Sequence, residues 1–72
     1  MKRDAKYKVI FVGDYMVGLK YGDIVEWTGD YDAWDEYYDV KKVGSELSGY
    51  VPKNKVNDYL VEVKNGKEVW DI

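Results

Sequence analysis

Apolar and polar residues alternate in short runs along most of the chain, and glycine or aspartate separates the runs. The alternation has the period of two that β-strands show, and β-branched and aromatic residues are frequent within it. The clearest runs cover residues 7–12, 24–28, 36–43, 50–51, 59–63 and 68–72, and a shorter run at 15–21 is interrupted by glycine. No segment longer than one turn has the 3.6-residue period of a helix. The pattern predicts an all-β chain.

The strongest local signal is the Asn65-Gly66 pair between the last two runs. Both residues tolerate a positive φ, so the pair favours a type I′ turn and predicts a hairpin of residues 59–63 and 68–72. Pro52, the chain's only proline, ends another run because it has no N–H for a strand ladder. Five or six short strands in 72 residues indicate a single domain, either a small barrel or a sandwich.

Composition indicates that aromatic rings supply much of the core. The 72 residues include eight tyrosines, three tryptophans and one phenylalanine, but no cysteine. A chain of this size buries a modest fraction of its surface, and it has no disulfide to support it. No apolar run is long enough for a signal peptide or a membrane span. We therefore expect a soluble, cytoplasmic domain spanning residues 1–72, with residues 1–5 as a polar lead-in.

The residue types argue against catalysis and against a bound cofactor. The chain has no histidine, so the commonest general base near neutral pH and the commonest metal ligand are both missing. Without histidine or cysteine, no pair of nucleophile and base can be drawn. The acidic run of Asp30, Asp32, Asp35 and Glu36 lacks the turn glycine and the closing glutamate of a calcium loop. The sequence therefore predicts no enzyme, no cofactor and no metal site.

Charge is distributed unevenly along the chain, although the net charge is only −3. Residues 23–39 carry seven acidic residues and no basic one, and four lysines follow within residues 41–55. An acidic surface attracts basic partners and repels phosphate backbones.

Three segments, taken in order, resemble the Src homology 3 (SH3) family of small β-barrels. Residues 17–27 (Val-Gly-Leu-Lys-Tyr-Gly-Asp-Ile-Val-Glu-Trp) are similar to the family's Leu-x-Phe-x-x-Gly-Asp-apolar segment. Residues 37–41 (Tyr-Tyr-Asp-Val-Lys) resemble its Trp-Trp-x-Ala-x strand, and residues 49–56 (Gly-Tyr-Val-Pro-Lys-Asn-Lys-Val) resemble Gly-x-Phe-Pro-x-Asn-Tyr-Val, which contains a single-turn 3₁₀ helix. Loop 29–35 falls at the family's n-Src loop, and turn 44–49 falls at its distal hairpin.

The resemblance implies a five-stranded SH3-like barrel, with residues from about 61 to 72 as an added C-terminal hairpin. It also implies a set of core residues, namely Val17, Leu19, Val25, Trp27, Val40, Val51 and Val56.

The same resemblance places a peptide groove near Tyr37, Pro52 and Asn54, because SH3 domains bind proline-rich peptides on exposed aromatic rings. Tyr37 would replace the first groove tryptophan, and Lys55 stands where the groove tyrosine is expected. The Ala-Leu-Tyr-Asp-Tyr motif of the family is not present, and Phe11 to Val17 leaves too little chain for its RT loop. The resemblance therefore supports the fold more strongly than it supports binding of proline-rich peptides.

The loop around residues 29–37 is the predicted contact surface. Aromatic rings beside carboxylates suit a cationic side chain, and large exposed rings in a loop indicate binding. The candidate partner-binding residues are Tyr31, Trp34, Tyr37, Asp32, Asp35, Pro52 and Asn54. We therefore predict a non-enzymatic module that binds a protein or peptide of basic or proline-rich character. The alternative is that Trp34 covers the barrel and the acidic residues form a solvated loop.

Two other functions remain open at this stage. Residues 59–72 either expose a strand edge that joins a partner or a second copy, or they use Trp70 and Ile72 to close one end of the barrel. Nucleic acid would be bound by lysines with a stacking ring, which in this chain are Lys41, Lys42, Lys53 and Lys55 with Tyr50. The negative net charge and the acidic block make nucleic acid the weaker alternative.

Overall fold

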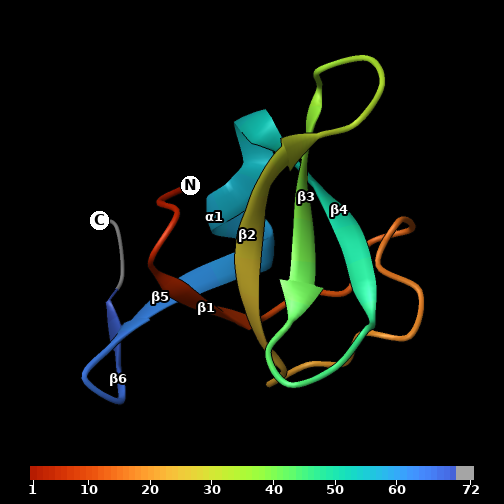
Figure 1. Cartoon of the computed structure of the whole chain (residues 1–72). Helices are drawn as coiled ribbons and strands as arrows, with labels where there is room; N and C mark the ends of the chain where they lie inside the picture. The colour runs from red at the N-terminus through yellow and green to blue at the C-terminus, as the bar shows by residue number, and fades with distance from the viewer. Residues whose placement is uncertain (70–72) are drawn as a thin grey trace.

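The computed structural model describes residues 1–69, which form an antiparallel sheet with little helix (Figure 1). Its strands are β1 (Lys6–Val9), β2 (Ile24–Tyr31), β3 (Tyr37–Lys42), β4 (Ser48–Pro52), β5 (Leu60–Lys64) and β6 (Lys67–Val69). A 3₁₀ turn, η1 (Lys53–Lys55), and one helical turn, α1 (Val56–Tyr59), connect β4 to β5. Across residues 1–69 the strand order is β4-β3-β2-β1-β5-β6. The prediction of an all-β chain is confirmed.

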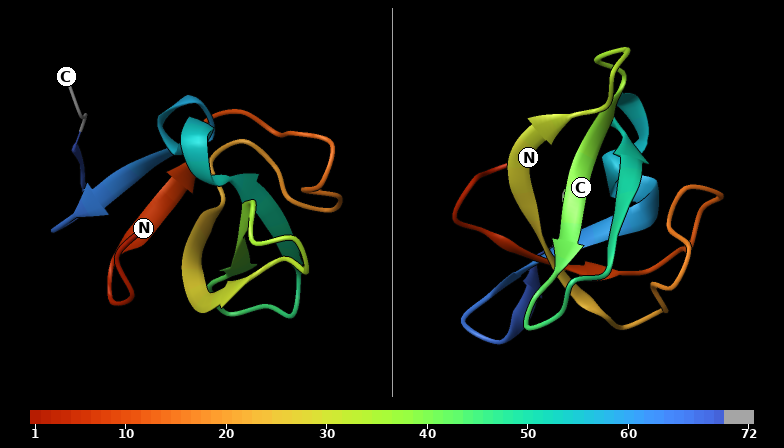
Figure 2. Two further views of the ribbon diagram at one scale, coloured as in Figure 1. Left: turned by 90° about the horizontal axis from the view of Figure 1, so that it is seen from above. Right: turned by 45° about the vertical axis from the view of Figure 1, so that its right-hand side comes forward.

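The sheet folds around a small apolar core. Strands β2, β3 and β4 run side by side, and β1 and β5 cross them at a steep angle, as two further views show (Figure 2). Side chains between these two groups of strands are removed from solvent. The buried cluster consists of Tyr7, Val9, Met16, Leu19, Val25, Val40, Val51 and Leu60.

The expected core is partly correct. Of the core residues that the family resemblance implied, four are buried: Leu19, Val25, Val40 and Val51. Trp27 and Val56 are half-buried, and Val56 packs against the cluster from outside. Val17 is 82% exposed, so its expected place in the core was wrong, and the neighbouring Met16 is fully buried instead.

Met16 rather than Val17 is buried because residues 10–23, the segment between β1 and β2, form turns. Residues 10–12 and 15–21 were predicted as strand but are not strand here. Three backbone hydrogen bonds between residues three apart define the turns: Met16 N–H to Gly13 O, Leu19 N–H to Met16 O and Asp23 N–H to Lys20 O. Residues 10–23 therefore form one long loop, which extends beyond the segment from Phe11 to Val17 that the sequence left for it.

The middle turn decides which apolar side chains face inward. Gly18 occupies its third position with φ of 90°, as a type II turn requires. The turn brings Met16 and Leu19, three residues apart, to the same side of the chain, whereas Val17 lies at the outer corner. A strand would have paired Val17 with Leu19, because side chains two residues apart share a face.

This loop lies along the outer edge of β4 (Figure 2). The Tyr50 N–H donates a hydrogen bond of 2.9 Å to the Tyr15 carbonyl oxygen. Gly49 allows the approach, because a Cβ at this position would lie 2.9 Å from both Met16 Cα and the Tyr15 oxygen. The loop therefore covers a strand edge that would otherwise be open for pairing.

Asp23 ends the loop, and its carboxylate gives a testable pH dependence. Its Oδ2 accepts a 2.8 Å hydrogen bond from the Lys20 N–H, and the Lys42 ammonium lies 3.4 Å from Oδ1. These contacts lower the pKa of Asp23, and the backbone hydrogen bond from Lys20 has the largest effect. Asp23 therefore adds stability above its ordinary pKa, and this stability is lost as the pH falls through the lowered pKa.

We expect Asp23→Asn to be slightly less stable than the wild type at pH 7, and the difference to disappear as the pH falls through the lowered pKa of Asp23. Asparagine keeps an oxygen that accepts the hydrogen bond from the Lys20 N–H. The difference in stability between the variant and the wild type therefore measures the effect of the negative charge alone. Urea unfolding across this pH range measures it, with Asp14→Asn in the same loop as the control. A destabilisation that does not change with pH would contradict this account.

The C-terminal hairpin forms where the sequence predicted it. Asn65 and Gly66 have φ of 54° and 76°, and β5 pairs with β6 on either side of them. The three residues of β6 are exposed. Trp70 and Ile72, which were expected either to close a barrel end or to expose an edge, lie outside the described residues.

Residues 1–5 pack against the sheet and are more than a polar lead-in. The Lys2 N–H donates a hydrogen bond of 2.9 Å to the Tyr7 hydroxyl, and Met1 and Ala5 pack against the core. The Arg3 guanidinium lies directly over the backbone of Gly29. None of the helices within residues 1–69 has the length and apolar character needed to cross a membrane.

Candidate functional site

Asp32 organises the loop between β2 and β3. Its Oδ1 accepts hydrogen bonds from the Glu36 N–H at 2.7 Å and from the Tyr37 N–H at 3.0 Å. Its carbonyl oxygen accepts a third bond from the Asp35 N–H at 3.0 Å, and Asp35 has φ of 60°. This turn holds Trp34 away from the sheet with 79% of its surface exposed. Trp34 therefore does not cover the core, and it is free to contact a partner.

Tyr31 belongs to a separate aromatic cluster. Its ring centroid lies 5.5 Å from that of Trp27 and 5.7 Å from that of Tyr38. The Lys53 ammonium lies 3.8 Å from the centroid of the Tyr31 ring and 2.9 Å from Asp35 Oδ1. The hydrogen bond to Asp35 raises the pKa of Lys53. A cation of the chain itself therefore occupies the position that the sequence suggested for a partner's cation beside Tyr31 and Asp35.

The other predicted residues line two adjoining hollows. One hollow, of about 410 Å³, is lined by Tyr15, Asp32, Ala33, Trp34, Glu36, Tyr37 and Tyr50. The other, of about 610 Å³, is lined by Asp35, Glu36, Tyr37, Pro52, Lys53, Asn54, Lys55 and Tyr59. Because Glu36 and Tyr37 line both hollows, we treat them as one surface and call it the Tyr37 groove.

Three of the tyrosines that line this groove, Tyr15, Tyr37 and Tyr59, belong to edge-to-face ring pairs. Tyr15 and Tyr37 have ring centroids 5.3 Å apart at 85°, and Phe11 and Tyr59 have centroids 5.2 Å apart at 88°. Burial raises the pKa of Tyr37, and the nearby Tyr15 and acidic side chains raise it further. The Tyr37 hydroxyl therefore stays protonated at neutral pH and can donate a hydrogen bond to a ligand.

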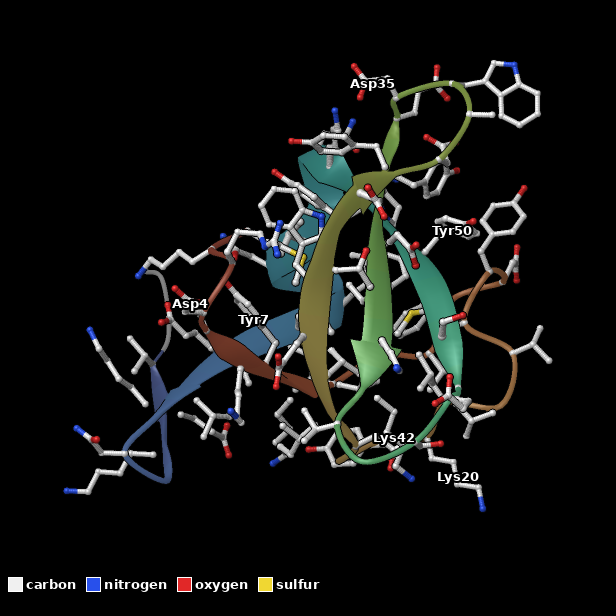
Figure 3. The ribbon with its side chains drawn as sticks, viewed as in Figure 1. Asp4, Tyr7, Lys20, Asp35, Lys42 and Tyr50 are labelled. Atoms are coloured by element: carbon white, nitrogen blue, oxygen red, sulfur yellow. The ribbon has the colours of Figure 1, made fainter. Side chains whose placement is uncertain are left out.

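The structure brings three tyrosines to the groove, Tyr15, Tyr50 and Tyr59, that were not among the predicted partner-binding residues; the sequence had suggested Tyr50 only as a stacking ring for nucleic acid. Tyr50 lies between Gly49 and Val51, which are both buried. Because side chains alternate between the two faces of a strand, the sequence alone could have predicted an outward-facing Tyr50 ring. Figure 3 shows Tyr50 on β4 and Asp35 in the loop above it. Tyr15 and Tyr59 carried no such signal, because both had been assigned to strands, whereas Tyr15 lies in a turn and Tyr59 ends α1.

The lysines proposed for nucleic acid are mostly paired with carboxylates. Lys41 lies 3.6 Å from Glu46, and Lys42 and Lys53 pair with Asp23 and Asp35. Lys55 takes part in no ion pair within residues 1–69. In the same part of the chain, carboxylates do not gather in a group of three or more that would hold a metal ion.

No protein-family model, curated protein sequence or solved structure matches this chain. The function is therefore inferred from the groove itself.

Proposed function

We propose that the chain is an SH3-like domain that binds an extended peptide of basic or proline-rich character in the Tyr37 groove. Several features support the fold. The loop of residues 10–23 stands where the family has its RT loop, and the 3₁₀ turn η1 follows Pro52 as the resemblance implied. β1 pairs with both β2 and β5, so the first and fifth strands are neighbours, as a closed five-stranded barrel would require.

The observation that carries the functional proposal is the gathering of aromatic rings from three separate segments. Tyr15 comes from the loop before β2, Trp34 and Tyr37 come from the β2–β3 region, and Tyr50 comes from β4. Tyr15 and Trp34 are 60% and 79% exposed. Gathered exposed rings indicate a contact surface.

An extended peptide is the partner that suits this surface best. Polyproline II segments dock on aromatic-lined grooves, because their conformation is already formed before binding. The carboxylates of Asp32 and Glu36 favour a basic residue in the peptide by charge complementarity. The domain would therefore act as an adaptor that holds a partner and performs no chemistry.

Trp34→Ala and Tyr37→Ala should each weaken peptide binding by at least about tenfold, because ring anchors carry most of the energy of such contacts. Trp34→Ala should leave the thermal transition nearly unchanged, since its ring is exposed. The measurement is fluorescence anisotropy with labelled proline-rich peptides that contain arginine. Tyr21→Ala, a 68% exposed ring outside the groove, is the matched control. Unchanged binding by both groove variants would exclude this site.

A second candidate function is assembly through β6. β6 ends the strand order of residues 1–69, and its residues are exposed, whereas the opposite end strand, β4, is covered by the loop of residues 10–23. An uncovered strand edge can pair with another chain. We rank this function below peptide binding, because β6 has only three described residues and two of them, Lys67 and Glu68, are charged.

A further inference from the structure

The charges in the Tyr37 groove do not all remain free for a ligand. Asp35 and Lys53 line the groove but satisfy one another at 2.9 Å. Lys53 also lies over the Tyr31 ring. This pair has no net charge, so the remaining charged side chains of the groove determine its electrostatic interaction with a ligand.

The hollow that holds Trp34 has acidic character. Asp32 and Glu36 line it, and no lysine or arginine is among its lining residues. Neither carboxylate forms an ion pair within residues 1–69. Asp32 uses Oδ1 for the loop's backbone bonds, and its second oxygen has no hydrogen bond within the same residues.

The hollow that holds Tyr59 contains an unpaired cation. Lys55 is exposed at the end of η1, and it lines this hollow but not the other one. It forms no ion pair within the described part of the chain. The amide of Asn54, next to it, can donate further hydrogen bonds to a carboxylate.

We infer that the groove selects a peptide with two opposite charges: a basic side chain in the Trp34 hollow, and an aspartate or glutamate side chain held by Lys55 and Asn54. This inference rests on the proposed function and refines its partner. The rings of Tyr37 and Tyr59 contact the apolar segment between the two charges. Both charge contacts lie at the surface, so each raises the affinity for the peptide only modestly. Their effect is larger on the selectivity between peptides of different charge.

The test uses acetylated and amidated peptides, so that the only charges are side chains. Each has a proline-rich middle with arginine at one end, and the other end carries aspartate, alanine or lysine; the length of the middle is varied. Wild-type protein should bind the aspartate form about two- to fivefold more tightly than the alanine form, and the lysine form more weakly than either. Lys55→Glu should reverse this order, and 1 M NaCl should reduce the differences.

Lys64→Glu is the matched control, because it makes the same change of charge on an exposed lysine outside the groove. It should leave the order of the three peptides as in the wild type. If Lys55→Glu also leaves the order unchanged while Trp34→Ala still weakens binding as expected, the two-charge inference is wrong and peptide binding stands. If no peptide binds in a Trp34-dependent manner, the proposed function fails and the inference fails with it.

Discussion

Replacing Met16 by alanine should destabilise the protein by about 2–5 kcal/mol, because it removes a fully buried side chain from the core. For a small domain this is a large share of a total that is typically about 5–15 kcal/mol. Urea unfolding followed by tryptophan fluorescence measures the change. Because Met16 anchors the loop of residues 10–23, the variant should also hold Tyr15 less firmly in the groove.

The control for Met16 is its neighbour Val17, which the family resemblance placed in the core. Val17→Ala should change the free energy of unfolding by no more than about 0.5 kcal/mol, because the side chain is 82% exposed. The two variants differ by one position and test the turn geometry directly. A greater loss from Val17→Ala than from Met16→Ala would mean that residues 15–21 form a strand after all.

Gly49→Ala should destabilise the protein by about 1–3 kcal/mol, the typical cost of overpacking. The added methyl group would meet backbone atoms, Met16 Cα and the Tyr15 oxygen at 2.9 Å, and backbone cannot rotate away as a side chain can. The loop would have to separate from β4 and would lose the hydrogen bond from the Tyr50 N–H.

Hydrogen exchange at the Tyr50 amide gives a local readout of this separation, and urea unfolding gives the global one. Ser48→Ala, at an exposed position next to Gly49, should change neither. Tyr50 protection that stays at the wild-type level in Gly49→Ala would show that the loop and β4 can accommodate a Cβ.

Features that depend on local chemistry could be predicted from the sequence. The Asn65-Gly66 turn needs only two residues that tolerate a positive φ, and the hairpin forms around it. Val25, Val40 and Val51 lie in clear alternating runs, and all three are buried. Pro52 ended a strand for a reason intrinsic to proline.

Features that depend on contacts distant in sequence could not be predicted. The apolar residues at 15–21 fit a strand as well as a series of turns, and packing of Met16 under Gly49 decides between them. The same holds for the groove. Lys53 neutralises Asp35 from a segment 18 residues away, so the loop sequence alone made Asp35 look available to a partner.

The covered edge of β4 has a consequence for how the protein would aggregate when it is destabilised. While the loop of residues 10–23 is in place, it lies along the outer edge of β4, the longer of the two end strands, and takes the Tyr50 N–H that would otherwise face a neighbouring molecule. A change that releases the loop exposes this edge together with the apolar side chains beneath it. If the proposed groove binds a peptide, the loop that carries Tyr15 would serve both that contact and the cover of the β4 edge, so a change that loosens it should increase aggregation.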